Sequence, residues 1–318
     1  MQTPVDTLIV CSCDQSYFPL LKGLILSICE QGRLGAGIGL AFIDIGCEAR
    51  SVSWLQERGV RVCRPDPQIL GGLADPALGY QRSQTCRPLL PKLFPDAAIF
   101  IWIDCDTWVQ DASIFPILRS AVEKDRDKLF IAPECHYSYT HINDGCLERH
   151  QEMFSYYQPV FGTEVAQRMC LRPTLNSGFF AMAADNAIWA EWETEVRRIY
   201  LGEPNEYDPQ VRHMAEQIAL NVIAARGSRV TLLDPLYNYV CLWNSPFRDA
   251  EGVVRVALPP HLPIGIIHLA GGWLRFGAAY ASRGLLYRGG SYLCDEDRTL
   301  LFHELDPTIA NPRVIRHA

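Results

Sequence analysis

Three short apolar segments alternate with two amphipathic segments at the start of the chain, and this alternation constrains the fold more than any other feature. The apolar segments, residues 7–13, 40–45 and 59–63, have the length and composition of β-strands. The segments between them, residues 17–31 and 51–58, space their apolar side chains as helices do. Strands that alternate with helices form a mostly parallel sheet with helices on both faces. We therefore predict an α/β fold.

The remainder of the chain continues this alternation less regularly. Further strands are predicted at residues 98–103, 128–132, 179–183, 230–233 and 265–268, and helices at residues 111–124, 187–200, 213–225 and, interrupted by prolines, 83–93. Residues 64–80, rich in proline, glycine and aspartate, predict a loop, and residues 134–175 show only weak periodicity. No segment repeats at a fixed interval, so we predict one main domain with a C-terminal appendage.

Composition and charge exclude several classes of protein. With 48% hydrophobic and 20% charged residues, the 318-residue chain has the composition of a folded protein. Its formal net charge of −7 argues against nucleic acid as a partner. The sequence contains no run of about 18 apolar residues, so no transmembrane helix is predicted. The first residues lack the basic region of a signal peptide. We predict a cytoplasmic protein, with contact to a membrane surface left open.

The 12 cysteines predict free thiols. They are scattered, with no CxxC pair and no Cys/His cluster at zinc spacing. Several of them, including Cys11, Cys13, Cys105 and Cys170, lie in apolar runs. A buried reduced thiol packs as a small hydrophobic group, and a chain of this length needs no disulfide framework.

Two aspartates, Asp104 and Asp106, follow the most apolar predicted strand, residues 98–103. Alternate side chains of an extended segment point to the same side, so the two carboxylates should lie together and Cys105 should point away. Ligands of open α/β sheets bind at the carboxyl ends of strands. A divalent cation would relieve the repulsion between the carboxylates, and oxygen ligands beside a phosphate suit Mg²⁺ or Mn²⁺. The pattern therefore predicts a metal site, although such a pair can also cap a loop.

Other polar residues lie where predicted strands or helices could present them to a ligand. His268 ends an apolar strand, and an imidazole ligand would favour Mn²⁺ over Mg²⁺; the alternative is a histidine that is only hydrogen-bonded at a strand end. Asn176 could bind sugar hydroxyls or form an ordinary turn. Glu216 and Gln217 interrupt an apolar stretch, so they either cap the start of a helix or face the site.

A series of short motifs follows an order that resembles the family 8 glycosyltransferases. The motifs are Cys-Asp-Gln-Ser-Tyr at 13–17, Arg87 before a proline, Asp-Cys-Asp at 104–106, Asn-Ser-Gly at 176–178, Glu-Gln-Ile-Ala-Leu-Asn at 216–221, Tyr-Asn-Tyr at 237–239 and Ile-Ile-His-Leu-Ala-Gly at 266–271. Members of this family are retaining enzymes of the GT-A fold and include bacterial lipopolysaccharide galactosyl- and glucosyltransferases and glycogenin. The resemblance implies a GT-A catalytic domain over residues 1–275, with residues 276–318 as a C-terminal extension.

The resemblance also implies a function. The chain would transfer a hexose with retention from a UDP-sugar to a hydroxyl of a saccharide or another acceptor. Asp104, Asp106 and His268 would hold Mn²⁺, with Mg²⁺ as the alternative, and the UDP diphosphate would complete the shell. Asp14 would contact the uridine or ribose, Arg87 the donor sugar or diphosphate, and Gly271 and Arg275 the phosphates. Asn176 would line the sugar pocket, and Gln217 would lie near the anomeric carbon. Together with Glu216, these two are the candidate catalytic residues.

The chain departs from the family pattern at three positions. Glu216 stands where the family usually has aspartate, and Ile218 stands where it often has another acid. These changes bear on how the hydroxyls of the sugar are handled. Arg275 follows the place of the family's phosphate-binding lysine, and its geometry differs from that of lysine.

Two other functions compete with this interpretation. The segment 104–107 is also similar to the aspartate motif of haloacid dehalogenase-type phosphatases, in which Asp104 would be the nucleophile. The chain could also be a catalytically silent sugar-binding protein on the same scaffold. The aromatic-rich segment 136–161 could stack on an acceptor sugar or belong to the core. Trp243, Trp273 and Phe276 could cover the donor or seat the C-terminal segment.

Overall fold

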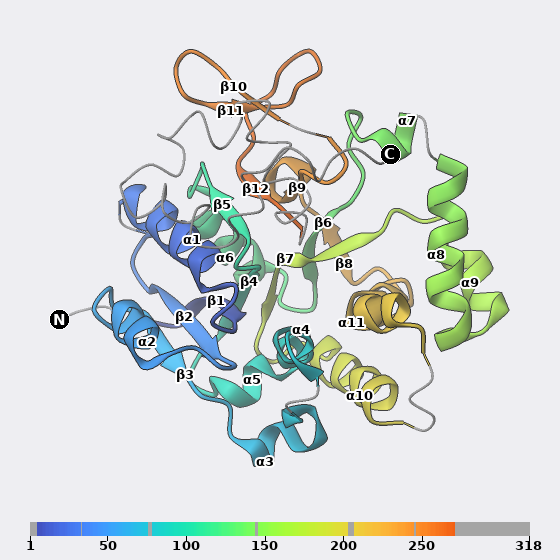
Figure 1. Ribbon diagram of the computed structural model, residues 1–318, viewed down its shortest axis with the longest axis horizontal. Coiled ribbons are helices and arrows are strands. Elements are labelled where there is room, and N and C mark those ends of the chain that lie inside the picture. The colour runs from blue at the N-terminus through green and yellow to red at the C-terminus, as the bar shows by residue number, and fades with distance from the viewer. Residues whose placement is uncertain are drawn as a thin grey trace, which may run out of the picture.

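A seven-stranded sheet forms the centre of the computed structural model, which describes residues 5–32, 34–75, 78–143, 146–202, 207–244 and 246–270 (Figure 1). Its strands, in spatial order, are β3 (Arg61–Cys63), β2 (Ile38–Asp44), β1 (Thr7–Cys13), β4 (Ile99–Ile103), β7 (Leu175–Ala183), β6 (Leu129–Pro133) and β8 (Val230–Leu232). Strand β7 is antiparallel to β4 and β6, and every other neighbouring pair is parallel. The predicted mostly parallel sheet is confirmed.

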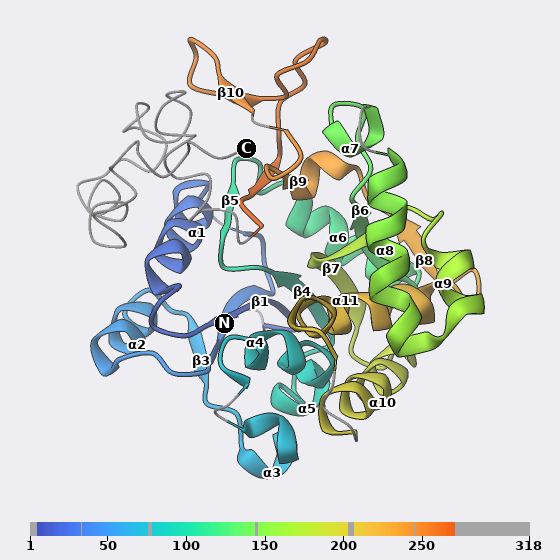
Figure 2. The ribbon, with the colours of Figure 1, turned by 45° about the vertical axis from the view of Figure 1, so that its right-hand side comes forward.

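Helices cover both faces of this sheet because side chains alternate along its strands. On one face, Ile9, Ile101 and their neighbours pack against α1 (Phe18–Glu30), α2 (Ala49–Gln56) and α6 (Ile114–Lys124). On the other, Val10, Trp102 and their neighbours pack against α4 (Gln81–Cys86), α5 (Leu90–Leu93), α8 (Cys146–Phe161), α9 (Thr163–Met169), α10 (Ile188–Leu201) and α11 (Pro209–Ala224). Figures 1 and 2 show α8 and α9 together beside the sheet. The sequence predicts this arrangement, with helices on both faces of the sheet.

A second, smaller sheet brings His268 next to the predicted aspartates. It contains β5 (Thr107–Val109), β12 (Ile266–His268) and β9 (Tyr239–Val240), with β12 in the middle. Strand β12 is antiparallel to β5, and His268 is paired with Thr107. Because Thr107 directly follows Asp106, this register places the histidine beside the two aspartates. A two-stranded hairpin, β10 (Phe247–Arg248) and β11 (Val254–Arg255), lies next to this sheet (Figure 1).

Short or polar helices account for most differences from the sequence predictions. The predicted loop 64–80 contains α3 (Pro67–Leu70), capped by the Asp66 side chain, and a 3₁₀ turn, η1 (Gly71–Ala74). The weakly periodic segment 134–175 contains α7 (Thr140–Asn143), α8 and α9. Few side chains of α8 are buried, so its apolar periodicity is weak. The interrupted helix predicted at 83–93 is confirmed as α4, a 3₁₀ turn η3 (Arg87–Leu89) and α5.

Two predictions about the chain as a whole can be compared with the described residues. Every cysteine among them is a free thiol, including the buried Cys11, Cys13, Cys105 and Cys170. In the same part of the chain, no helix is long and apolar enough to cross a membrane.

Candidate active site

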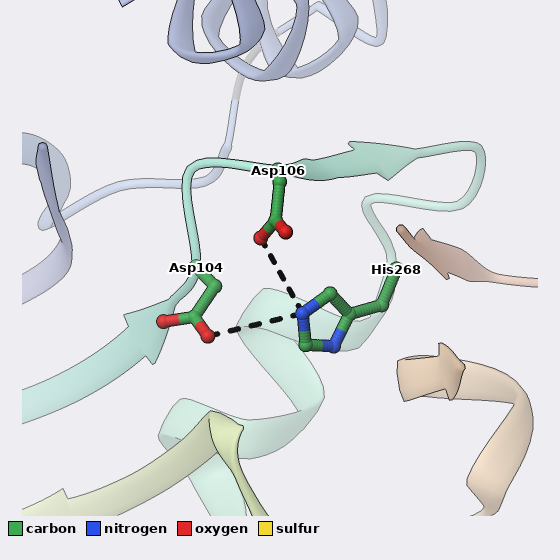
Figure 3. Close-up of side chains that lie close together, drawn as sticks. All are labelled: Asp104, Asp106 and His268. Atoms are coloured by element: carbon green, nitrogen blue, oxygen red, sulfur yellow. Dashed lines mark ion pairs between the residues drawn. The ribbon is translucent and has the colours of Figure 1, made fainter. Parts of the chain in front are cut away.

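Three side chains converge at the carboxyl edge of the sheet: Asp104, Asp106 and His268 (Figure 3). The Nε2 atom of His268 lies 3.4 Å from Oδ1 of Asp106 and 3.8 Å from Oδ2 of Asp104. Around an octahedral cation with bonds of about 2.1 Å, adjacent ligand atoms lie about 3 Å apart and opposite ones about 4.2 Å. The spacing and the chemistry of the three donors therefore fit one divalent cation.

A turn, rather than an extended segment, brings the two carboxylates together. Residues 105–106 form a turn between β4 and β5, and the backbone N–H of Asp104 donates to the carbonyl oxygen of Gly178 at 2.8 Å. The Thr107 hydroxyl donates to the Asp104 carbonyl oxygen at 2.7 Å. Cys105 packs into the apolar core, so the carboxylates face the site and the thiol points away, as expected. The expectation that the segment itself is extended is wrong.

His268 presents one ring nitrogen to the carboxylates and the other to an amide. Its Nδ1 atom lies 2.8 Å from Oδ1 of Asn238. Burial disfavours a charge on the ring, but the negative charges of Asp106 and Asp104 outweigh that cost and raise the pKa of His268. The imidazole is thus held within a negative environment, which is also the environment that attracts a cation.

One of these aspartates belongs to a buried cluster of charges centred on Arg87. The guanidinium of Arg87 donates to Asp104 at 2.5 Å, to Glu216 at 2.5 Å and to the hydroxyl of Ser177 at 2.7 Å. The indole N–H of Trp102 donates to the same Asp104 oxygen, Oδ1, at 2.7 Å. Asp104 is therefore fixed through Oδ1, and its other oxygen, Oδ2, faces His268. Arg87, predicted to touch the donor, here contacts two carboxylates.

Glu216 faces this cluster from the interior of α11. The helix begins at Pro209 and is capped by Asp208, so the alternative in which Glu216 and Gln217 cap a helix start is wrong. The Glu216 side chain is 1% exposed. Burial raises its pKa to about 7, although the positive charge of Arg87 lowers it.

Asn176 and Gln217 lie beside a carboxylate that sequence reasoning missed, Glu134. Because β7 is antiparallel, its first residues reach the same edge of the sheet as the ends of β4 and β6. The Asn176 amide donates to Glu134 Oε1 at 2.7 Å, and that of Gln217 does so at 3.4 Å. Arg149 pairs with the other Glu134 oxygen at 2.8 Å. The position of Glu134 directly after β6 was the sequence signal that could have revealed it.

The remaining predicted residues are placed as follows. Asp14 directly follows β1. Its Oδ1 accepts hydrogen bonds from the backbone N–H of Ser16 at 2.9 Å and from the Ser16 hydroxyl at 2.5 Å. Tyr139 and Tyr157, from the aromatic-rich segment, are core residues. Trp243 packs against the Arg149 guanidinium, whose carbon lies 4.9 Å from the ring centre. Four predicted residues lie outside the described part of the chain: Gly271, Trp273, Arg275 and Phe276.

Replacing Gly178 with alanine is expected to disrupt this site. A Cβ atom at position 178 would lie 2.5 Å from Cε1 of His268 and 2.8 Å from Oδ2 of Asp104. Both side chains would have to shift, and such overpacking costs about 1–3 kcal/mol. We expect a clear loss of divalent-cation binding at this candidate site, measured by calorimetric titration with Mn²⁺. Gly227→Ala is the control, because the Cβ atom there meets nothing closer than 4.0 Å. Equal Mn²⁺ affinity in the two variants would contradict the geometry.

Comparison with solved structures identifies the fold of this chain. No family model matches the sequence, and no curated protein matches it. A solved structure of an active-site mutant of the galactosyltransferase LgtC is 14% identical, with a TM-score of 0.51 over 83% of this chain and 87% of that one. The bifunctional glycosyltransferase WbbM is 14% identical, with a TM-score of 0.52 over 85% of this chain and 46% of that one. Mouse xyloside xylosyltransferase 1 is 12% identical, with a TM-score of 0.51 over 84% of this chain and 98% of that one. The chain therefore has the GT-A fold of these glycosyltransferases, as the sequence predicts.

Proposed function

We propose that this chain is a metal-dependent glycosyltransferase that moves a hexose, with retention, from a UDP-sugar to an acceptor hydroxyl. The observation that carries the proposal is the convergence of Asp104, Asp106 and His268 on one point within a glycosyltransferase fold. We propose Mn²⁺ as the cation, because the donor set adds an imidazole to two carboxylates, and Mg²⁺ as the alternative. A cation there would neutralise charge on a diphosphate leaving group.

The side chains around the cation site would bind and orient the donor. We propose that Asn176 contacts the sugar and that Asp14, Gly271 and Arg275 contact the nucleotide. Arg87 and Glu216 would act mainly by holding Asp104 in place, since each is engaged in the buried cluster. The catalytic domain would extend to about residue 275, with residues 276–318 as an extension.

We propose that Gln217 acts near the anomeric carbon. Its carbonyl oxygen accepts from the Ser177 amide at 3.1 Å, so its orientation is fixed. An amide oxygen can stabilise positive charge but is a weak nucleophile. We therefore propose a front-face transfer: the acceptor oxygen bonds to the anomeric carbon as the bond to UDP breaks, and the hydroxyl proton passes to the departing phosphate. A sugar ester on Glu134, found by mass spectrometry, would contradict this mechanism.

The fold favours this proposal over the phosphatase alternative. The aspartate motif of the phosphatases normally ends the first strand, whereas Asp104 follows β4, with β1, β2 and β3 before it. The solved structures that the chain resembles are glycosyltransferases. A catalytically silent protein remains an outcome of the experiment below.

Binding and turnover of nucleotide sugars test the proposal directly. We expect a UDP-hexose with Mn²⁺ to raise the melting temperature, because a ligand at 100 times its Kd stabilises the folded state by about 2.7 kcal/mol. We also expect slow release of UDP that stops when EDTA is added. Binding without turnover in any acceptor panel would indicate a silent sugar-binding protein. Hydrolysis of a generic phosphate ester without UDP binding would favour a phosphatase.

A further inference from the structure

We propose that Asn238 is a positioning residue that fixes the tautomer and the orientation of His268, and thereby the affinity of the cation site. The inference rests on the proposed function in taking His268 as a ligand. Asn238 ends the 3₁₀ turn η4 (Pro235–Asn238) and is 1% exposed. Its side chain lies between His268 and Asn176, so it connects the proposed cation site with the proposed sugar site.

The direction of each hydrogen bond between Asn176, Asn238 and His268 follows from neighbouring groups that can only donate or only accept. A backbone N–H can only donate, and that of Gly178 donates to Asn176 at 2.8 Å, so the acceptor there is the Asn176 carbonyl oxygen. An ionised carboxylate accepts hydrogen bonds and cannot donate them. Glu134 accepts from the other end of the Asn176 amide at 2.7 Å, so that end is the NH₂ group. The two contacts fix which end of the Asn176 amide is oxygen and which is nitrogen.

The orientation of Asn176 then determines that of Asn238. The Asn176 oxygen also lies 3.0 Å from the Asn238 side chain, so the Asn238 atom facing it must be the NH₂ group. The opposite end of Asn238 is therefore the carbonyl oxygen, which lies 2.8 Å from Nδ1 of His268. This oxygen can only accept, so Nδ1 of His268 carries the hydrogen whether the ring is neutral or charged. In the neutral ring, the lone pair on Nε2 faces Asp104 and Asp106.

Backbone contacts on both sides of Asn238 also fix the position of its side chain relative to the His268 ring. Asn238 is anchored at its backbone by η4, whose N-cap Asp234 accepts from the Leu236 amide at 2.9 Å. The next residue, Tyr239, pairs with Ile267 in the small sheet. Asn238 directly precedes β9 and His268 ends β12, and these two strands are neighbours in one sheet, so its register fixes the separation of the amide and the imidazole. Hydrogen bonds of this kind to a ligating histidine typically change metal affinity by about 10–100-fold when they are removed.

Three variants of the full chain test this role. Asn238→Leu removes the hydrogen bond and keeps the branched shape and the number of heavy atoms of the side chain. Asn238→Asp keeps an oxygen acceptor for Nδ1 but loses the NH₂ donor to Asn176. Asn186→Leu is the matched control: Asn186 is also buried and donates to Arg126 and Lys128 carbonyl oxygens at 3.0 and 3.2 Å, but it follows the far end of β7. Free Mn²⁺ is measured by electron paramagnetic resonance without nucleotide, and the ¹⁵N shifts of the His268 ring report its tautomer, with His268→Gln identifying the signals.

We expect Asn238→Leu to weaken Mn²⁺ binding by about 10–100-fold and Asn238→Asp to restore most of that affinity. We expect Asn186→Leu to lower stability without changing Mn²⁺ affinity. In the neutral ring of the original protein, ¹⁵N shifts should show hydrogen on Nδ1 only, and Asn238→Leu should mix the tautomers. Unchanged tautomer populations in Asn238→Leu would overturn the inference, even if Mn²⁺ does not bind. Failure of the original protein to bind Mn²⁺ while the tautomer depends on Asn238 would instead overturn the proposed metal function.

Discussion

Replacing Arg87 with methionine is expected to lower the free energy of unfolding by about 3–5 kcal/mol, the cost of removing one partner from a buried ion pair. The Arg87 side chain is 7% exposed, and that of its partner Glu216 is 1% exposed. Methionine cannot compensate the charge of Glu216 or Asp104, so at least one buried carboxylate would have to ionise unpaired or take up a proton. Chemical denaturation of the two proteins measures the difference.

Two further variants separate this effect from a general effect of losing an arginine. Arg61→Met removes an exposed pair with Asp96, in which the side chains are 45% and 62% exposed, and should cost less than about 1 kcal/mol. Adding Glu216→Gln to Arg87→Met should restore part of the stability, because the amide carries no charge. Arg87 lowers the pKa of Glu216, which is about 7 with the arginine present, so this pKa should rise above 7 in Arg87→Met. The destabilisation should therefore shrink as the pH falls from alkaline values toward 7, where the carboxyl group takes up a proton. Equal costs for Arg87→Met and Arg61→Met would contradict a buried cluster.

The sequence predicted the central sheet because its inner strands β1 and β4 are buried on both faces. Strand β4 is a continuous apolar run and β1 is mostly apolar, and such runs have few alternatives to a buried strand. The small sheet was harder to predict in full. Its strands β5, β9 and β12 have two or three residues each, and their pairing depends on contacts between distant segments. Helix α8 was missed because it buries few of its side chains.

The sequence located the three candidate metal ligands of the site, but not the residues that orient them through hydrogen bonds. Asp104, Asp106 and His268 follow or end apolar strands, and the carboxyl edge of a sheet is where such groups gather. Asn238 and Glu134 act through hydrogen bonds that only tertiary structure reveals. Arg87 was expected at the donor because the resemblance to the family 8 glycosyltransferases implied that contact. Its two carboxylate partners come from separate segments, so the sequence could not show that they neutralise it.

Replacing Asp106 with asparagine is expected to lower kcat/KM for transfer from a UDP-sugar by at least about 100-fold, or ~2.7 kcal/mol. Asp106 is 7% exposed, and its Oδ1 lies 3.4 Å from Nε2 of His268. Asparagine keeps the shape of the side chain but removes a negative charge from the proposed cation site. Because the cation would be bound less tightly, the charge on the departing diphosphate would be stabilised less. Steady-state kinetics over a range of Mn²⁺ concentrations measures the loss.

The same variant also shows whether the loss arises at the metal site or from the fold. If Asp106 is a ligand, the rise in melting temperature that Mn²⁺ causes should disappear in Asp106→Asn, and its residual activity should no longer respond to EDTA. Asp127→Asn is the matched control, because it makes the same change at an exposed residue between α6 and β6 and should behave as the original protein does. A fold defect would lower the melting temperature in the absence of Mn²⁺, whereas loss of a ligand would remove only the Mn²⁺-dependent part. Full transfer activity in Asp106→Asn, with the Mn²⁺-dependent rise intact, would show that this carboxylate does not bind the cation.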